Sequence, residues 1–275
     1  MENLLTAWSK VIEQFKKADH VLLLLDYDGT LTPIVGRPEE ATLSDDMRQL
    51  LQALAHQNHL RVGIISGRAL TDLKNKVKID NIIYAGNHGL EIEGPGVRFV
   101  NPLAEEIRPV IRIITQVLER TLNTIKGVVV EDKGLTLSVH YRQVDEDKAT
   151  EVKDTFNRVV GGAEAIGQVR VTTGKKVYEV RPAADWDKGK AIKLLMRKYG
   201  KGGRESGLLP VYLGDDLTDE DGFKVIGKYG NGISILVSEV ERETAACYFL
   251  KSPAEVGRFL NLLLEQAKRG LRSEF

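Results

Sequence analysis

The chain has 275 residues, which at roughly 150 residues per domain allows about two domains. Its 39 Lys and Arg residues balance its 39 Asp and Glu residues, and this zero net charge argues against a protein that coats nucleic acid or an anionic membrane. A hydrophobic fraction of 42% and a charged fraction of 28% are typical of a folded globular protein and argue against disorder.

The single cysteine, Cys247, excludes an internal disulfide and a multi-cysteine zinc site. Because Tyr248 and Phe249 follow it, we expect a small core residue and not a nucleophile. The N-terminus lacks the basic start and long apolar stretch of a signal peptide, and the longest aliphatic run, 21–25, is too short to span a membrane. We therefore expect a soluble cytoplasmic protein.

The first part of the chain alternates between helical and strand patterns. In chain order, the sequence predicts a helix over 4–17, a strand over 21–25, a helix from the N-cap Ser44 to about 57, a strand over 60–65, a helix over 69–77 and a strand over 82–85. A short continuous apolar run such as 21–25 suits a strand that is buried on both faces. This alternation predicts a doubly wound, mostly parallel α/β sheet.

The pattern changes in the middle of the chain. We predict a helix over 103–125, a hairpin of 128–130 with 135–141, a helix over 147–160, and a hairpin of 168–173 with 176–181 that turns at Gly174-Lys175. Afterwards we predict a helix over 188–199, strands over 208–213, 232–236 and 246–250, and helices over 219–227 and 253–268. The fold class is thus α/β, with a discontinuous core of residues 1–103 and 182–275 and an inserted α+β cap domain of residues 104–181.

Polar side chains follow three of the predicted core strands, and binding sites of doubly wound sheets lie at the carboxyl ends of strands. The residues concerned are Asp26 and Asp28, then Ser66, then Asp215, Asp216 and Asp219. Each segment alone could be an Asx turn or a helix cap, but their joint placement favours one shared site. Clustered carboxylates repel unless a cation lies among them, and oxygen ligands without His or Cys favour Mg²⁺ over zinc.

These segments resemble the motifs of the haloacid dehalogenase (HAD) superfamily. Their exact residues resemble those of the trehalose-6-phosphate phosphatase family. The matching motifs are Asp26-Tyr27-Asp28-Gly29-Thr30-Leu31, Ile64-Ile65-Ser66-Gly67-Arg68, Gly86-Asn87-His88-Gly89-Leu90-Glu91, Val177-Tyr178-Glu179-Val180-Arg181-Pro182, Lys188-Gly189-Lys190-Ala191 and Gly214-Asp215-Asp216-Leu217-Thr218-Asp219-Glu220-Asp221. The resemblance covers about residues 21–265. It implies that residues 104–181 form the mobile cap of such enzymes.

The resemblance also implies catalytic roles. Asp26 would be the nucleophile that forms an aspartyl-phosphate, and Asp28 the general acid and base. Mg²⁺ would be held by Asp26, Asp215 and the backbone carbonyl of Asp28, with Asp219 as a further ligand or, as we favour over Asp216, as outer support. Ser66 and Lys188 would bind the phosphate, and Lys188 would also pair with Asp26.

Substrate recognition is assigned to a second group of residues. In the family, positions that match Glu131, Lys133, Arg142, Lys176 and Glu179 grip the disaccharide, and charged groups bind sugar hydroxyls well because one group makes several hydrogen bonds. We also assign Arg68, Asn87 and His88 to substrate binding. His88 could equally be a hydrogen-bonded structural histidine, and Asn87 stands where the family more often has Glu.

The expected activity is Mg²⁺-dependent hydrolysis of trehalose 6-phosphate to trehalose and phosphate, a step of trehalose biosynthesis. The alternatives are a phosphatase for sucrose phosphate or a glycosyl-phosphoglycerate, a catalytically silent sugar-phosphate-binding subunit, or a phosphomutase. The expected partner is a small sugar phosphate, with no nucleic acid and no membrane. A monomer and a trehalose-phosphate synthase as a partner both stay open.

Overall fold

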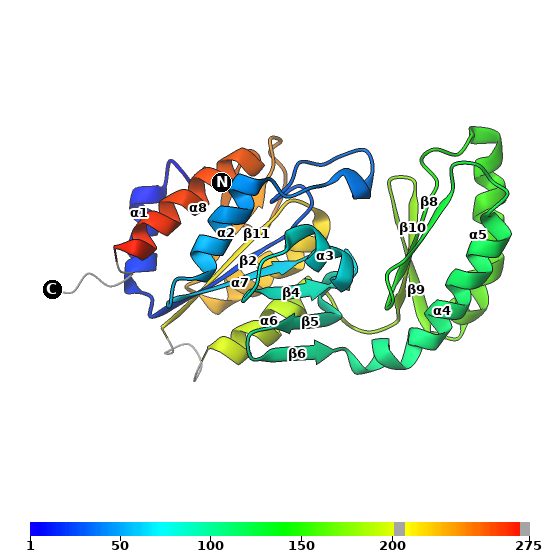
Figure 1. The fold of residues 1–275 in the computed structure, drawn as a ribbon, viewed down its shortest axis with the longest axis horizontal. Helices are drawn as coiled ribbons and strands as arrows, with labels where there is room; N and C mark the ends of the chain where they lie inside the picture. Colours follow the sequence, from blue (N-terminus) through cyan, green and yellow to red (C-terminus); the bar gives the residue numbers. More distant parts are fainter. Residues whose placement is uncertain (201–206, 270–275) are drawn as a thin grey trace. The chain divides into compact units, whose positions relative to one another are not determined.

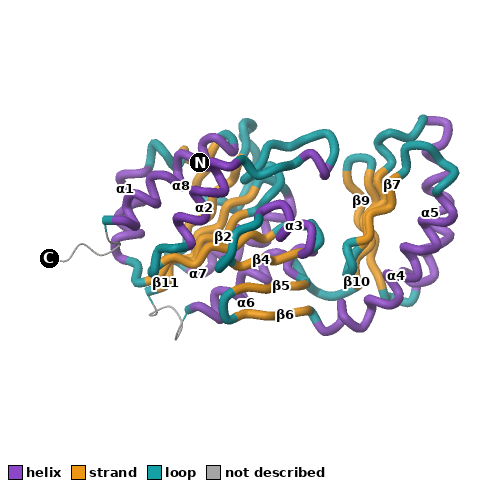
Figure 2. The backbone as a smooth tube through the Cα atoms, in the orientation of Figure 1, coloured by secondary structure: helices purple, strands orange, loops and turns teal. Residues whose placement is uncertain are grey.

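The structure, a computed structural model, describes residues 1–200 and 207–269. The chain forms two compact units, one of Met1–Arg98 with Trp186–Phe275 and one of Phe99–Asp185 (Figure 1). The first unit is α/β and the second, inserted between two segments of the first, is α+β (Figure 2). The predicted fold class is therefore confirmed.

The first unit is built on a nine-stranded sheet of described residues in the order β1-β13-β12-β11-β2-β3-β4-β5-β6. The strands are β1 (Glu2–Asn3), β2 (His20–Leu25), β3 (Leu60–Ile65), β4 (Ile83–Gly86), β5 (Glu91–Gly94), β6 (Val97–Val100), β11 (Leu208–Gly214), β12 (Ile233–Val237) and β13 (Tyr248–Leu250). Within the sheet, neighbouring strands are parallel all the way from β1 at the edge through β13, β12, β11, β2 and β3 to β4. The next strand, β5, is antiparallel to β4. Because the chain moves to β3 on one side of β2 and later returns to β11 on the other, the carboxyl end of β2 is a topological switch point.

Helices cover both faces of this sheet. They are α1 (Trp8–Lys17), α2 (Asp45–Ala55), α3 (Leu70–Val77), α6 (Lys188–Tyr199), α7 (Glu220–Tyr229) and α8 (Pro253–Lys268), with short 3-10 turns η1 (Pro38–Glu40), η2 (Asn87–Gly89) and η3 (Leu217–Asp219). Phe15 of α1 and Phe259 of α8 share a core with Leu23 of β2. On the other face, Phe223 of α7 packs on Tyr212 of β11 with ring centroids 5.6 Å apart. The apolar run 21–25 is fully buried, as its composition predicts.

The second unit is a four-stranded antiparallel sheet with two helices packed on one face. Its elements are α4 (Pro102–Leu122), β7 (Val129–Asp132), β8 (Leu137–His140), α5 (Glu146–Ala165), β9 (Val169–Gly174) and β10 (Val177–Pro182), with the strand order β7-β8-β10-β9. Val139 and Val180 of the sheet form one core with Ile111 of α4 and Phe156 of α5. The α+β module predicted for residues 104–181 lies inside this unit.

Several local expectations need correction. The strand β1 and the β5–β6 pair were not predicted from the sequence. The second hairpin turns at Lys175-Lys176, one residue later than predicted, because Gly174 still pairs with Val177 and Lys176 has a φ of 63°. The expectation that Cys247 is buried is wrong, since this cysteine is exposed just before β13.

No helix within residues 1–200 and 207–269 has the length and apolar character that a membrane crossing requires.

Candidate active site

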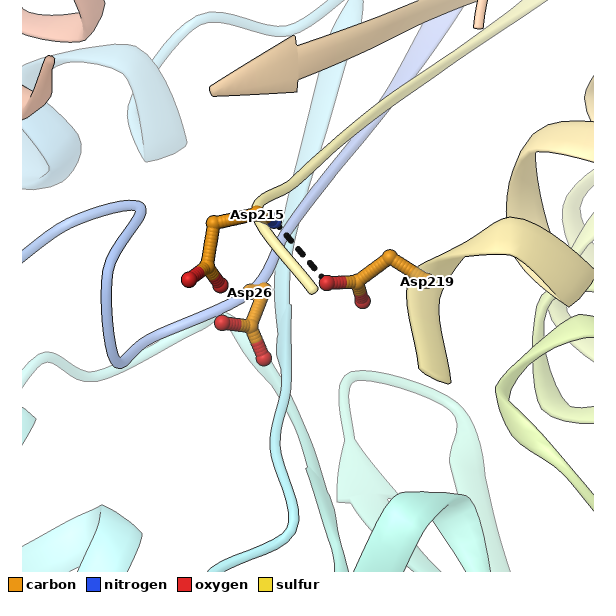
Figure 3. A group of neighbouring side chains, drawn as sticks. All are labelled: Asp26, Asp215 and Asp219. Carbon is orange, nitrogen blue, oxygen red and sulfur yellow. Dashed lines mark hydrogen bonds between the residues drawn. The ribbon is translucent and has the colours of Figure 1, made fainter. Parts of the chain in front are cut away.

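Three carboxyl groups meet where two neighbouring strands end. Asp26 follows β2 and Asp215 follows β11, and the Asp26 N–H donates to the Leu213 carbonyl at 2.9 Å. With Asp219 of η3, these side chains offer oxygen atoms that all lie within 4.8 Å of one another (Figure 3). The predicted convergence of segments that lie far apart in the sequence therefore exists for these residues.

Lys188 supplies a buried positive charge to this group. It is the first residue of α6, its side chain is 3% exposed, and its Nζ lies 2.7 Å from Asp26 Oδ1 and 2.7 Å from Asp219 Oδ1. A cation in the first helical turn opposes the helix dipole, so the two carboxylates, and not the helix, favour its position. The predicted pairing of Lys188 with Asp26 is present.

Asp219 is fully buried, and all of its described partners are protein donors. Its Oδ1 accepts hydrogen bonds from Lys188 and from the Tyr212 hydroxyl. Its Oδ2 accepts the N–H of Asp215 at 2.9 Å, the bond drawn in Figure 3, and the N–H of Asp216 at 3.0 Å. Four donors fill the lone-pair capacity of one carboxylate. This arrangement favours a role for Asp219 in holding the backbone of Asp215 and Asp216 in place, without itself binding a metal. Asp216 is exposed, and its side chain caps η3 by accepting the Thr218 N–H.

Tyr212 belongs to this network although its sequence position predicted no such role. Its hydroxyl reaches Asp219 from the sheet face that α7 covers, although β11 reads as uniformly apolar. A tyrosine inside such a strand was the available signal, because a buried hydroxyl needs a polar partner.

Burial of like charges changes the proton affinity of the site. Burial raises the pKa of Asp26 well above its usual range, Lys188 counteracts this, and Asp219 and Asp215 raise it further. Burial, with the carboxylates of Asp216 and Asp219, raises the pKa of Asp215 to about 7. Burial would lower the pKa of Lys188, but Asp219 and Asp26 outweigh it and raise that pKa. The carboxylates thus outnumber the cation, which leaves room for more positive charge.

The carboxylate of Asp28 faces a buried arginine. Arg68 donates from Nε to Asp28 Oδ2 at 2.7 Å and from Nη2 to Asp28 Oδ1 at 2.6 Å. Its Nη1 donates to Asp72 Oδ2 at 2.9 Å, and its guanidinium lies 5.3 Å from the centre of the Tyr27 ring. Burial would lower the pKa of Arg68, but its bonds to Asp28 and Asp72 raise that pKa, so this arginine stays charged.

The other predicted residues of this unit lie around the ends of β3 and β4. Ser66 is buried, and its Oγ accepts the Arg68 N–H at 3.2 Å. Asn87 is fully buried, and its side chain donates to Glu91 at 2.8 Å. His88 has a φ of 57°, and its ring lies so close to Gly67 that a Cβ at this glycine would be 2.6 Å from Nε2. Their roles in substrate binding stay predictions.

The loop after β2 approaches Asp215 closely. Gly29 has a φ of 83°, and a Cβ at this position would lie 2.1 Å from Asp215 Oδ2. Both the left-handed backbone and the lack of space require glycine here.

In the second unit, a cluster of charges covers the sheet face opposite the helices. Strand register places Glu131, Ser138 and Glu179 side by side across β7, β8 and β10. Lys133 Nζ lies 3.8 Å from both Glu131 Oε2 and Glu179 Oε1. His140, for which no role was predicted, contacts Glu131, and Arg181 contacts Glu179.

The remaining two predicted sugar-binding residues lie at the end of the hairpins. Arg142 Nη2 lies 3.5 Å from the Lys175 carbonyl, and Lys176 Nζ lies 5.8 Å from the centre of the Tyr141 ring. The structure thus groups Glu131, Lys133 and Glu179 and places Arg142 and Lys176 next to the β9–β10 turn.

The acidic group on the first unit fits a metal ion. Its oxygen atoms come from Asp26, Asp215 and Asp219, and hard oxygen ligands of this kind suit a hard divalent cation. Because Asp219 already receives four hydrogen bonds, Asp26 and Asp215 are the side chains best suited to hold the ion.

Comparison with known proteins agrees with this arrangement. A sequence model described as trehalose-phosphatase matches residues 24–254. The chain is 38% identical over 274 residues to a probable trehalose-phosphate phosphatase 3 of Oryza sativa subsp. japonica, covering 94% of this chain and 73% of that protein. It is 39% identical over 269 residues to the trehalose 6-phosphate phosphatase RA3 of Zea mays, covering 93% and 72%.

A solved structure shares the fold over nearly the whole chain. It is the C-terminal domain of the trehalose-6-phosphate phosphatase of C. albicans, with a TM-score of 0.75, 27% sequence identity, and coverage of 94% of this chain and 96% of that one. The predicted family and the predicted enzyme class are confirmed, and the chain belongs to the trehalose-phosphatase family of HAD-like phosphoric monoester hydrolases.

Proposed function

We propose that the protein hydrolyses trehalose 6-phosphate to trehalose and phosphate with the help of Mg²⁺. The observation that carries the proposal is the buried ion-pair group in which Lys188 joins Asp26 and Asp219 beside Asp215. The names of relatives with 38% and 39% identity support trehalose 6-phosphate as the substrate.

Asp26 is the proposed nucleophile. One of its carboxylate oxygens attacks phosphorus, and the bond between phosphorus and the sugar oxygen breaks, which yields an aspartyl-phosphate and trehalose. Lys188 supports this step because its Nζ lies 2.7 Å from Asp26 Oδ1. Its positive charge offsets the repulsion between the Asp26 carboxylate and the approaching phosphate dianion. Ser66, buried at the end of β3, would hold a phosphate oxygen through its hydroxyl.

Asp28 is the proposed general acid and base. As an acid it gives its proton to the departing sugar oxygen, and as a base it takes a proton from the water that attacks the aspartyl-phosphate. The second step releases phosphate and restores the Asp26 carboxylate.

Asp26 and Asp215 would hold the magnesium ion, together with the backbone carbonyl of Asp28. When bound, the ion would neutralise the charge that gathers on the phosphate oxygens during transfer. The excess of carboxylates over cations around Asp215 supports this assignment.

The charged sheet face of the second unit is the proposed sugar-binding surface. Glu131, Lys133 and Glu179 present acceptors and a donor within one cluster, as a ligand rich in hydroxyls requires. We extend the surface to Arg142 and Lys176 on the family pattern alone.

The test is phosphate release from trehalose 6-phosphate by the purified chain. We expect activity with Mg²⁺, none after chelation, and a loss of at least about a thousandfold in Asp26→Asn, because the nucleophile is removed while the side-chain volume is kept. Asp19→Asn, at the opposite end of β2, is the control and should keep normal activity. Normal turnover in Asp26→Asn would overturn the nucleophile assignment.

A further inference from the structure

The contacts of Arg68 suggest a role other than substrate binding. Its side chain is 8% exposed, and Nε, Nη1 and Nη2 all donate to carboxylates of this chain. A guanidinium bound at both edges of its fork is held in one plane. In this conformation its donors face Asp28 and Asp72.

Two further contacts keep the arginine in place. Its guanidinium lies 5.3 Å from the centre of the fully buried Tyr27 ring, a cation–π distance. Its backbone N–H donates to Ser66 Oγ and its carbonyl accepts the Asn87 N–H at 2.7 Å. The arginine is thus held through its backbone by Ser66 and Asn87 and through its side chain by Tyr27, all in the α/β unit.

Asp72 completes the arrangement from the first turn of α3. It stands four residues after Arg68, its Oδ2 receives Nη1 at 2.9 Å, and its side chain is 39% exposed. Asp72 lies outside the sequence motifs that match the family. Its carboxylate fixes the edge of the guanidinium that Asp28 does not use.

We propose that Asp72 and Arg68 form a clamp that positions the Asp28 carboxyl group for proton transfer to the departing sugar oxygen. Both are positioning residues, and Asp72 acts through Arg68. The inference deepens the proposed function and depends on it, because it assumes that Asp28 is the general acid.

The choice of phosphate ester separates this role from a general structural one. A sugar alkoxide is a poor leaving group and needs a proton, whereas p-nitrophenolate leaves as a stable anion without one. The constant kcat/KM covers the steps up to transfer of the phosphoryl group to Asp26. Hydrolysis of the aspartyl-phosphate, which both esters share, does not enter it.

The experiment compares kcat/KM for trehalose 6-phosphate and for p-nitrophenyl phosphate in wild type, Asp72→Ala and Asp72→Asn. Because positioned proton transfer contributes about 10²–10⁴-fold, we expect Asp72→Ala to lose about tenfold on the sugar ester and less than about twofold on the aryl ester. Asp72→Asn should recover part of the loss, since its amide oxygen still accepts a bond from Nη1.

Asp45→Ala is the matched control. Asp45 also lies in the first turn of a helix and pairs with an arginine, Arg48, but it belongs to α2 and contacts none of the clamp residues in the described hydrogen bonds and ion pairs. This variant should leave both constants unchanged.

Arg68→Lys tests the fork itself. A lysine keeps the charge but cannot donate to both oxygens of Asp28 in one plane, so we expect the same selective loss on the sugar ester. An equal loss on both esters in Asp72→Ala, no loss at all, or a KM rise on both esters with kcat unchanged in Arg68→Lys would overturn the clamp. If wild type ignores trehalose 6-phosphate but cleaves another alkyl phosphate, the proposed function fails, and the clamp is tested with that ester.

Discussion

Lys188 occupies a position where one buried ammonium serves two carboxylates. Both Asp26 and Asp219 lie 2.7 Å from its Nζ, and its exposed fraction is 3%. Removing one partner of a buried ion pair leaves the other charge uncompensated in a medium of low polarity. The residue is therefore important for stability as well as for chemistry.

We expect Lys188→Met to lower the free energy of unfolding of the metal-free protein by about 3–5 kcal/mol at about pH 8. The pKa values of Asp26 and Asp219 are already raised in the fold, mainly by burial. A raised carboxyl pKa costs stability as pH rises from the unfolded value of about 4 through the folded value, so the loss should be smaller at about pH 5. Urea denaturation at the two pH values measures it.

The double variant Lys188→Met, Asp219→Asn serves as the control. Without Lys188, the carboxylates of Asp26 and Asp219 are both left without their buried cation. Asp219→Asn removes one of these two negative charges and should recover part of the lost stability. A loss below about 1 kcal/mol that does not change with pH would contradict the assignment of Lys188 as a charge-pairing residue.

At the scale of elements, the turn after β2 sets the position of Asp215. Gly29 and Gly96 both have positive φ values, 83° and 71°, so alanine strains the backbone at either position. They differ in surroundings: a Cβ at Gly29 would meet Asp215 Oδ2 at 2.1 Å, whereas a Cβ at Gly96 would have nothing within 4 Å. Alanine variants at the two glycines therefore separate the effect of backbone strain from the effect of displacing the Asp215 side chain, a proposed magnesium ligand.

We expect both Gly29→Ala and Gly96→Ala to lose about 1 kcal/mol of stability or somewhat more from backbone strain. Only Gly29→Ala should lose activity, by about tenfold or more, and weaken Mg²⁺ binding, because a small displacement at a reacting centre is costly. Phosphate release and Mg²⁺ titration check this. Equal activity of the two variants would show that Asp215 moves aside without consequence.

The strength of local sequence signals decided which elements could be predicted. The run 21–25 and the N-cap Ser44, whose Oγ accepts the Met47 N–H, are encoded locally, and the structure contains both. The β5–β6 pair has short edge strands, and its only clear signal was the turn dipeptide Pro95-Gly96. The two-residue strand β1 exists only because it pairs with β13, which no local pattern reveals.

The same distinction applies to the candidate site. Asp26, Asp215 and Asp219 follow predicted strands, so their convergence could be foreseen from topology. The bond between Tyr212 and Asp219 depends on tertiary packing. The Arg68–Asp72 pair has the i, i+4 spacing of helical neighbours and could have been noticed, although the contact with Asp28 could not.

For the whole molecule, a net charge of zero conceals a strongly acidic site. Residues 215–221 contain five acidic side chains and no basic one. The Asp215 pKa of about 7 lies above its unfolded value, so the stability that this group contributes is present below about pH 4 and is lost as pH rises towards 7. A bound dication should offset that loss.

We therefore expect Mg²⁺ to raise the melting temperature more at about pH 8 than at about pH 5, since carboxylates must be ionised to bind it. At about one hundred times its Kd, the ion should add about 2.7 kcal/mol, or about 5 °C for a chain of this size. Thermal unfolding with and without Mg²⁺ measures the shift. Asp215→Asn should reduce both the shift and its dependence on pH, part of which stays because Asp26, the other proposed ligand, also has a raised pKa. An unchanged shift in that variant would exclude Asp215 as a ligand.

The most direct measurement of the central claim is kcat/KM on a panel of phosphate esters with Mg²⁺. The panel holds trehalose 6-phosphate, sucrose phosphate, a glycosyl-phosphoglycerate and p-nitrophenyl phosphate. We expect trehalose 6-phosphate to exceed the other sugar phosphates by about tenfold or more, and Glu179→Ala on the charged sheet face to reduce that preference. Glu151→Ala, which breaks a surface ion pair on α5, should not reduce it. A preference for the phosphoglycerate ester, or no hydrolysis of any ester, would contradict the proposed function.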